Sequence, residues 1–143
     1  QAISVKIKLH HINLCSNNIS DMDQFYRDVL KLEDEDPSEL PPINNKKGLV
    51  GNVSFVTDGN IQMHLTERDV LNSFRSGHVV NPLDRGHIAY RTDDIFSFMS
   101  HLESLGIRYS DWGSNAVEGW HQVFFYDPDG NVIEVHQVLS SDE

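Results

Sequence analysis

The sequence predicts an α+β fold in which two βαβββ modules form one cup-shaped mixed sheet. Strand and helix patterns follow one another in the same order in both halves of the chain. The stretch HHINLCSNNI can also be laid over GHIAYRTDDI, which pairs His11 with His87 and indicates a duplicated module. We expect a single domain over residues 1–143, with the first module at about 5–66 and the second at about 84–138.

The first module is expected to begin with a strand and a helix. Residues 3–15 alternate between apolar and polar side chains and are rich in β-branched residues, which predicts a strand. Apolar residues then recur at helical spacing from 19 to 30. Asn18 or Ser20 is suited to cap the helix, because each carries a side-chain oxygen that can accept from a free backbone N–H group.

The rest of the first module is expected to form a loop and a hairpin. The stretch 33–48 is polar and rich in proline, which is typical of a loop. Two strands within 51–67 are joined at Asp58 and Gly59, a strong hairpin signal. The irregular stretch 67–85 then connects the two modules.

The second module repeats the order of elements. An amphipathic helix is predicted for IFSFMSHLESLG, ending at Gly106. A Pro-Asp-Gly turn joins the last two strands. The predicted strands of this half are GHIAYRTDD, IRYS, HQVFFYD and NVIEVHQ.

The composition excludes several classes of function. A net charge of −11 argues against nucleic acid and against anionic membrane surfaces as partners. No apolar run approaches the ~20 residues that a membrane-spanning helix needs. The single cysteine, Cys15, fits a reducing compartment, so we expect a cytoplasmic protein. Eight histidines are more than average for this length and favour a metal site.

The strand patterns direct three histidines and a glutamate to one side of the sheet. Apolar residues on these strands face the helices, so the residues between them point the other way. These residues are His11 and His64 in the first half, and His87 and Glu134 in the second half. If the halves face each other about a pseudo-twofold axis, the four side chains converge. Three imidazoles and a carboxylate suit one divalent Zn, Ni, Co, Mn or Fe(II) ion better than Mg or Ca.

Further residues of this face are candidates for a substrate pocket. Arg91 lies two residues after His87 and can orient a substrate carboxylate or pair with an acidic neighbour. The other candidate pocket residues are Asn13, Gln62 and Tyr126. Two tryptophans in the glycine-rich stretch DWGSNAVEGWHQ can form a wall of the pocket or pack in the core.

Three motifs of the chain resemble the vicinal oxygen chelate superfamily, which includes glyoxalase I, bleomycin-resistance proteins and extradiol dioxygenases. They are HHINLCSNNISDMDQFYRDVLKL, GHIAYRTDDI and FFYDPDGNVIEVHQ, and the resemblance extends from about residue 7 to 138. It implies paired βαβββ modules around a divalent metal, with His11, His87 and Glu134 at the family's metal positions. His10 is a weaker candidate, because the strand pattern places it on the apolar face.

The chain departs from the glyoxalase I pattern at the fourth metal position. The family carries a glutamate there, in a stretch like IELT, whereas this chain has His64 in MHLT. In glyoxalase I that glutamate is linked to proton shuttling between adjacent substrate carbons, so the replacement puts this particular reaction in question. His64 can be a fourth ligand or a general base, and its ordinary pKa of about 6.5 suits proton transfer. We name His64 and Glu134 as the candidate catalytic residues.

Three functions fit these residues. We prefer a metal-dependent lyase or isomerase whose small substrate chelates the metal through adjacent oxygens, as the resemblance implies. One alternative is an Fe(II)-dependent extradiol-type dioxygenase, although the dioxygenases of this superfamily are usually much longer. The other is a non-enzymatic drug- or ligand-binding protein of the bleomycin-resistance type. The resemblance also implies a homodimer, and it leaves open whether the site lies within one chain or between two.

Overall fold

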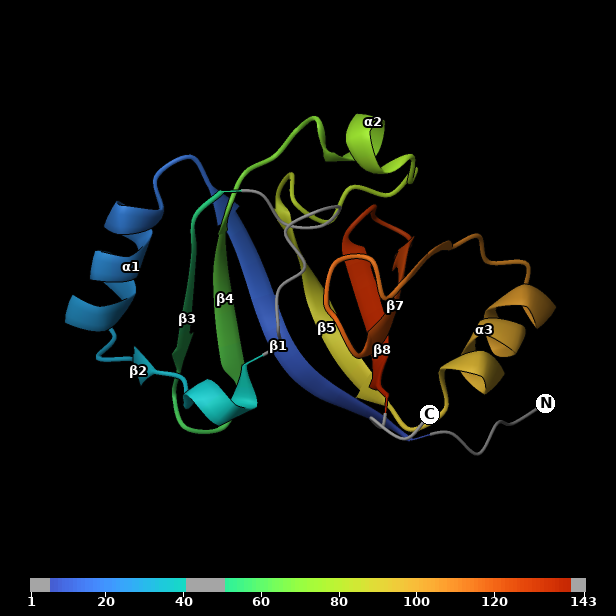
Figure 1. Cartoon of the computed structure of the whole chain (residues 1–143), viewed down its shortest axis with the longest axis horizontal. Helices are drawn as coiled ribbons and strands as arrows, with labels where there is room; N and C mark the ends of the chain where they lie inside the picture. The colour runs from blue at the N-terminus through green and yellow to red at the C-terminus, as the bar shows by residue number, and fades with distance from the viewer. Residues whose placement is uncertain (1–5, 41–50, 140–143) are drawn as a thin grey trace.

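A computed structural model of the protein describes residues 6–40 and 51–139 (Figure 1). The helices are α1 (Ile19–Asp28), α2 (Asn72–Ser76) and α3 (Ile95–Ser104), with a 3-10 turn at Pro37–Glu39. The strands are β1 (Ile7–Ser16), β2 (Glu33–Asp34), β3 (Val53–Thr57), β4 (Gln62–Glu67), β5 (Gly86–Thr92), β6 (Ser110–Gly113), β7 (Trp120–Tyr126) and β8 (Val132–Val138). Within the described residues they form one sheet in the order β2-β3-β4-β1-β5-β8-β7-β6.

The sheet is mixed and has an internal repeat. The first strands of the two halves, β1 and β5, lie next to each other and run antiparallel. On the other side of each, β1 pairs with β4 and β5 pairs with β8, both in parallel. This confirms the predicted α+β fold with two βαβββ-like modules. It also brings the first strands of both halves together at the centre of a single chain.

The two longer helices cover the outer face of each half-sheet. Figure 1 shows α1 and α3 at opposite ends of the molecule, with the sheet between them. Asn18 caps α1, because its side chain accepts a hydrogen bond from the N–H group of Asp21. Two of the apolar clusters lie under these helices, and the burial of each large apolar side chain in them stabilises the fold by roughly 1.5–3 kcal/mol. These are Ile19, Val56 and Leu65 under α1, and Ile95, Phe98, Leu102, Val123 and Val135 under α3.

Some elements differ from the sequence prediction. The short strand expected at IRYS is displaced toward the C-terminus, to β6, because the chain needs several residues to return to the sheet after α3. The connection 67–85 contains the short helix α2, and the predicted loop 33–48 begins with β2 and the 3-10 turn. The part of that loop from 41 to 48 lies outside the described residues. The predicted hairpin is present, with Gly59 at a positive φ of 96°.

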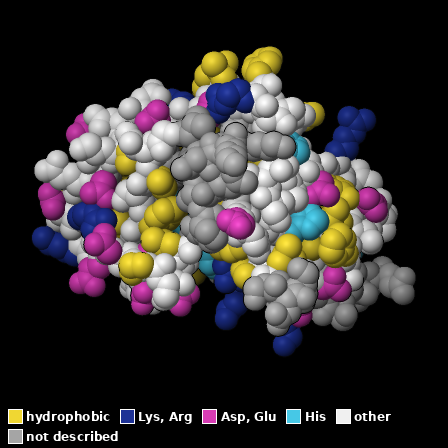
Figure 2. Space-filling view, viewed as in Figure 1, with side chains coloured by type: hydrophobic (Ala, Val, Ile, Leu, Met, Phe, Trp, Pro, Cys, Tyr) yellow, Lys and Arg dark blue, Asp and Glu magenta, His cyan; other side chains and the backbone are white. Residues whose placement is uncertain are grey.

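Acidic side chains are spread over both ends of the face shown in Figure 2, in keeping with the net charge of −11. Within residues 6–40 and 51–139, no helix combines the length and the apolar character needed to cross a membrane.

Candidate metal centre

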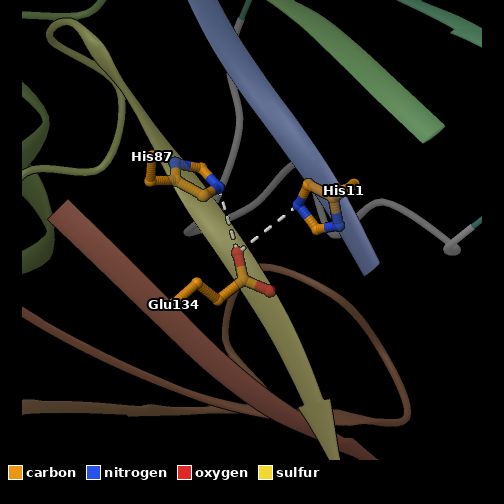
Figure 3. A group of neighbouring side chains, drawn as sticks. All are labelled: His11, His87 and Glu134. Atoms are coloured by element: carbon orange, nitrogen blue, oxygen red, sulfur yellow. Dashed lines mark ion pairs between the residues drawn. The ribbon is translucent and has the colours of Figure 1, made fainter. Parts of the chain in front are cut away.

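Three of the predicted ligands meet at the centre of the sheet. His11 on β1, His87 on β5 and Glu134 on β8 place one ligand atom each within 4.8 Å of the others (Figure 3). Oε1 of Glu134 lies 3.0 Å from Nε2 of His87 and 3.7 Å from Nε2 of His11. All three side chains are buried. This group could therefore hold a metal ion, and it is built within one chain.

The strand register leaves space for this group. On the sheet, Ala89 lies opposite His11 on one side and opposite Glu134 on the other. The three residues thus form a row across β1, β5 and β8, and the middle one has the smallest side chain that carries a Cβ. A larger residue at position 89 would fill the space between the imidazole and the carboxylate.

The hydrogen bonds of His87 leave one of its nitrogens facing an acceptor. Its Nδ1 lies 2.9 Å from the backbone oxygen of Pro82, which can only accept, so Nδ1 carries the proton. Its Nε2 lies 3.0 Å from Oε1 of Glu134, where an imidazolium donates its second proton to the carboxylate and a neutral ring presents a lone pair. Two such acceptors need a second proton or a cation between them. Metal-binding histidines are typically oriented by a backbone carbonyl in this way.

The second carboxylate oxygen of Glu134 is fixed by its neighbours. Nδ1 of His136 donates to Oε2 over 2.7 Å. Arg91 donates from Nε to Nε2 of His136 over 3.0 Å, which places the proton of a neutral His136 on Nδ1. The ring of His136 also stacks on Trp120, with centroids 4.1 Å apart. Arg91 and His136 therefore hold the carboxylate so that Oε1 faces the two imidazoles.

The electrostatics of the group favour the forms that bind metals. Burial, reinforced by the neighbouring His64, lowers the pKa of His11 well below its ordinary value, so this imidazole is neutral at pH 7. Burial opposes ionisation of Glu134, but His11 and the hydrogen bond from His136 hold the pKa of this carboxyl well below its usual value. Neutral imidazole and ionised carboxylate are the states that coordinate a metal ion.

His64 lies beside this group but not within it. Its ring stacks on that of His11, with centroids 3.8 Å apart and an interplanar angle of 16°. Its Nε2 donates to Oε1 of Gln62 over 2.8 Å, while the amide nitrogen of Gln62 donates to the backbone oxygen of Glu39 over 3.0 Å. His64 thus carries its proton on Nε2 and its lone pair on Nδ1. Burial lowers its pKa to about 3, so the ordinary value on which the expected role as a general base rested does not apply to His64 in this structure. Its role as a fourth ligand stays a prediction.

The prediction that His10 lies on the apolar face was wrong. The register of β1 against β5 shifts between Leu9 and His11, so His10 is an extra residue in the strand. As a result His10 turns to the same side as His11, and their Nδ1 atoms lie 2.7 Å apart. Arg91 also contacts its Nε2 at 2.9 Å. His10 therefore contacts the group through the ring of His11. Burial lowers the pKa of His10 to about 3.

A cavity of about 70 Å³ lies against the group. His11, His64, His87 and Glu134 all line it. Among the described residues that line the cavity, Glu134 is the only charged one. Most of the others are apolar or aromatic, and the largest are Phe55, Leu83, Trp112, Trp120 and Phe124.

The predicted pocket residues have different positions. Asn13 lines the cavity and donates to the Thr66 hydroxyl over 2.9 Å. Gln62 is buried and does not line the cavity, but its side chain accepts a hydrogen bond from His64, which does. Arg91 and Tyr126 do not line the cavity: the guanidinium of Arg91 is engaged by histidines, and Tyr126 is 48% exposed. A direct substrate contact of these two residues stays a prediction.

Several cavity residues were not predicted. Phe55, Leu83 and Gln122 line the cavity without having been named from the sequence. The alternation of β7 contains a signal for Gln122, since the residue lies between Trp120 and Phe124 on the same face of that strand. The connection that carries Leu83 has no periodicity from which its position could be read.

Residues 8–135 match the family model described as Glyoxalase/Bleomycin resistance protein/Dioxygenase superfamily. The chain belongs to this superfamily, which confirms the resemblance seen in its motifs. No curated protein matches the chain in sequence.

Solved structures with the same fold include two epimerases. Methylmalonyl-CoA epimerase from Mycobacterium tuberculosis is 18% identical, with a TM-score of 0.63 over 93% of this chain and 89% of that one. The Streptomyces coelicolor methylmalonyl-CoA epimerase, in complex with 2-nitronate-propionyl-CoA, is 17% identical, with a TM-score of 0.63 over 93% and 98%. A hypothetical protein from Bacillus halodurans C-125 is 19% identical, with a TM-score of 0.62 over 96% and 99%. At these identities the similarity shows the fold.

Proposed function

We propose that the protein is a metal-dependent lyase or isomerase whose small substrate binds through two adjacent oxygen atoms. The observation that carries this proposal is the contact between His87 and Glu134. Nε2 of His87 and Oε1 of Glu134 lie 3.0 Å apart in the buried group, and the hydrogen bonds of His87 with Pro82 and of Glu134 with His136 fix both side chains in place. A divalent cation bound between the neutral imidazole and the carboxylate would take the place of a shared proton and compensate the buried charge.

The ligand set fits a transition metal. His11, His87 and Glu134 would hold the ion, because two imidazoles and one carboxylate suit zinc, nickel, cobalt, manganese or iron. When bound, the ion would supply Lewis-acid polarisation of the two substrate oxygens. The chain provides the remaining functions: it orients the ligands through Pro82 and His136, and it surrounds the substrate with apolar walls that exclude water.

His64 is the side chain of the cavity that we propose to move a proton on the substrate. It is neutral, and Gln62 holds its proton on Nε2, so the lone pair of Nδ1 is the basic position. The ring stacks on that of His11 and lines the same cavity as the ligand group. We expect Nδ1 to take a proton from the carbon next to the two substrate oxygens. Return of the proton on another face or carbon gives an isomer, whereas loss of a neighbouring group gives a lyase product.

The structural relatives support this class of reaction. Two of the structures described above are epimerases, and epimerisation consists of proton removal and return at one carbon. The proposal therefore names a type of reaction, proton transfer at a carbon next to a carbonyl group. It does not name a particular substrate.

An Fe(II)-dependent ring-cleaving dioxygenase is the second candidate. The group of two histidines and one carboxylate resembles the facial triad of non-haem iron oxygenases, and His64 remains free to act as acid or base. This candidate predicts oxygen consumption with a catechol by the iron-loaded protein. The lyase or isomerase predicts activity with zinc or cobalt and no need for oxygen.

Exchange of substrate hydrogen with solvent tests the proposed reaction. Zinc- or cobalt-loaded protein is incubated in D₂O with small hydroxy ketones and with methylmalonyl-CoA, and deuterium incorporation is followed by NMR. We expect His64→Asn to retain the metal and to lose exchange by about 10²-fold or more. His101→Asn is the matched control, because His101 lies on α3 and does not line the cavity.

Two results would contradict the proposal. Loss of the metal from His64→Asn would make His64 a ligand and not the base. No exchange by the metal-loaded wild type with any member of the panel would argue against proton transfer, and oxygen consumption with a catechol would then favour the dioxygenase.

A further inference from the structure

We propose that Trp112 and Gln122 form a hydrogen-bonding subsite of the metal cavity for an uncharged polar group of the substrate. The inference rests on the proposed function, because it concerns the part of the substrate beyond the two chelating oxygens. Two buried atoms carry it: the indole Nε1 of Trp112 and the side-chain oxygen of Gln122 have no hydrogen-bond partner within residues 6–40 and 51–139. Both residues line the same cavity as His87 and Glu134.

Such unpaired atoms are unusual in a folded protein. Buried polar groups nearly always have a partner, because an unpaired one loses its hydrogen bonds to water without compensation. Trp112 is 2% exposed and Gln122 is 5% exposed, so bulk solvent does not reach these side chains freely. The described residues contain one further atom of this kind, Oδ1 of Asn72 in α2, and Asn72 does not line the cavity. Since both residues line the cavity, a substrate bound there is the partner that we infer for these two atoms.

The two atoms specify the chemistry of their partner. An indole N–H group can only donate, and an amide oxygen can only accept. A hydroxyl or amide group of the substrate supplies both an acceptor for Trp112 and a donor for Gln122. A carboxylate does not suit this subsite, because it cannot donate to the amide oxygen and because no Lys or Arg is found among the described residues that line the cavity.

The sheet places the subsite within reach of a small molecule at the metal group. On β7 and β8, Phe124 lies opposite Glu134, so Gln122 is a diagonal neighbour of the glutamate. Diagonal neighbours across a strand pair have typical separations of roughly 7–8 Å. The ring of Phe124 contacts both His87 and Trp112, with centroid distances of 5.5 Å and 5.3 Å. An aromatic surface thus connects the subsite with the metal group and suits a flat substrate.

A matched pair of chelators tests the subsite. Kojic acid and allomaltol bind metals through the same pair of adjacent oxygens, and allomaltol has a methyl group where kojic acid has a hydroxymethyl group. We expect zinc-loaded wild type to bind kojic acid about tenfold more tightly than allomaltol in a calorimetric titration. In Gln122→Leu the ratio of the two affinities is expected to fall toward one.

Asn72→Leu provides the control, since it also removes a buried unpaired amide but lies outside the cavity. It should leave the ratio unchanged. Trp112→Phe should lower the ratio as Gln122→Leu does. Because Trp112 packs on Phe124, this variant can fail to fold for reasons of packing alone. The indole N–H resonance of Trp112 in ¹⁵N-labelled wild type is therefore a second readout, expected to shift with kojic acid more than with allomaltol.

Equal affinities for the two pyrones in the wild type would overturn the subsite, as would a ratio that survives in Gln122→Leu. A zinc titration is made before the two pyrones are added, so that failure of the proposed metal site can be distinguished from failure of the subsite. A protein that binds no zinc would contradict the metal site and, with it, the subsite. A protein that binds zinc but does not distinguish the pyrones contradicts the subsite alone.

Discussion

Replacement of Arg91 by methionine is expected to weaken metal binding although Arg91 does not contact the metal group. In the structure Arg91 donates to Nε2 of His136, and His136 in turn donates to Oε2 of Glu134. Methionine has a similar length and no donor, so His136 can move its proton to Nε2 and leave Oε2 without its partner. The carboxylate is then free to turn away from the two imidazoles.

The size of the effect follows from the contacts that are lost. Changes to residues that orient metal ligands typically reduce metal affinity about 10- to 100-fold. This corresponds to about 1.4 to 2.8 kcal/mol, which agrees with the roughly 1.5–3 kcal/mol of one hydrogen bond to a charged group. Arg91→Lys should recover part of the loss, because lysine restores a donor but not the fork of the guanidinium.

Two measurements check this prediction. Cobalt titration followed by visible absorption gives the affinity, and long-range ¹H–¹⁵N correlation spectra of the metal-free protein give the position of the His136 proton. Arg68→Met is the control, because Arg68 lies at the surface and contacts Asp84, away from the metal group. Unchanged cobalt affinity in Arg91→Met, together with an Nδ1 proton on His136 as in the wild type, would refute the positioning role of Arg91.

Three further predictions follow from the site. Ala89→Leu should abolish metal binding while costing about 1–3 kcal/mol of stability, because the larger side chain fills the row between His11 and Glu134; normal metal content in a folded variant would contradict this. The metal-free protein should lose stability as the pH falls from about 6.5 toward about 3, because His64 has a lowered pKa in the folded state and the unfolded chain takes up the proton first. Urea unfolding across this range should show a shallower pH dependence for His64→Asn than for wild type, and identical slopes would be evidence against a buried neutral His64. Removal of the metal by a chelator should lower the free energy of unfolding by about 2.7 kcal/mol, compared with protein at a free metal concentration of 100 times the dissociation constant. A melting temperature that does not change when the chelator is added would contradict tight binding.

The strand alternation, together with an assumed pseudo-twofold relation of the two halves, predicted a group of four side chains, of which three meet at the sheet centre and His64 lies beside them. His11, His87 and Glu134 each follow or precede apolar residues that must face a helix, so the period of two fixes their direction. The internal repeat then predicted that the first strands of both halves carry equivalent histidines. These are local patterns, which is why a single sequence was enough to identify them.

Other features of the site depend on contacts that no local pattern records. The bulge in β1 reverses the direction of His10, and one extra residue in a strand leaves no trace in composition. The engagement of Arg91 by His136 requires the register of β5 against β8, which was not known from the sequence. The position of His64, stacked on His11 and bonded to Gln62, likewise results from packing across β1 and β4.

The metal content of protein purified without oxygen or chelators tests the central claim most directly. Elemental analysis is made of wild type, His87→Ala and Glu134→Gln in parallel, with folding checked by circular dichroism. We expect about one transition metal ion per wild-type chain and a loss of at least tenfold in affinity in both variants. Folded wild-type protein that holds no metal, even after incubation with zinc, nickel, cobalt, manganese and iron in turn, would contradict the metal site and leave a cavity for ligand binding alone.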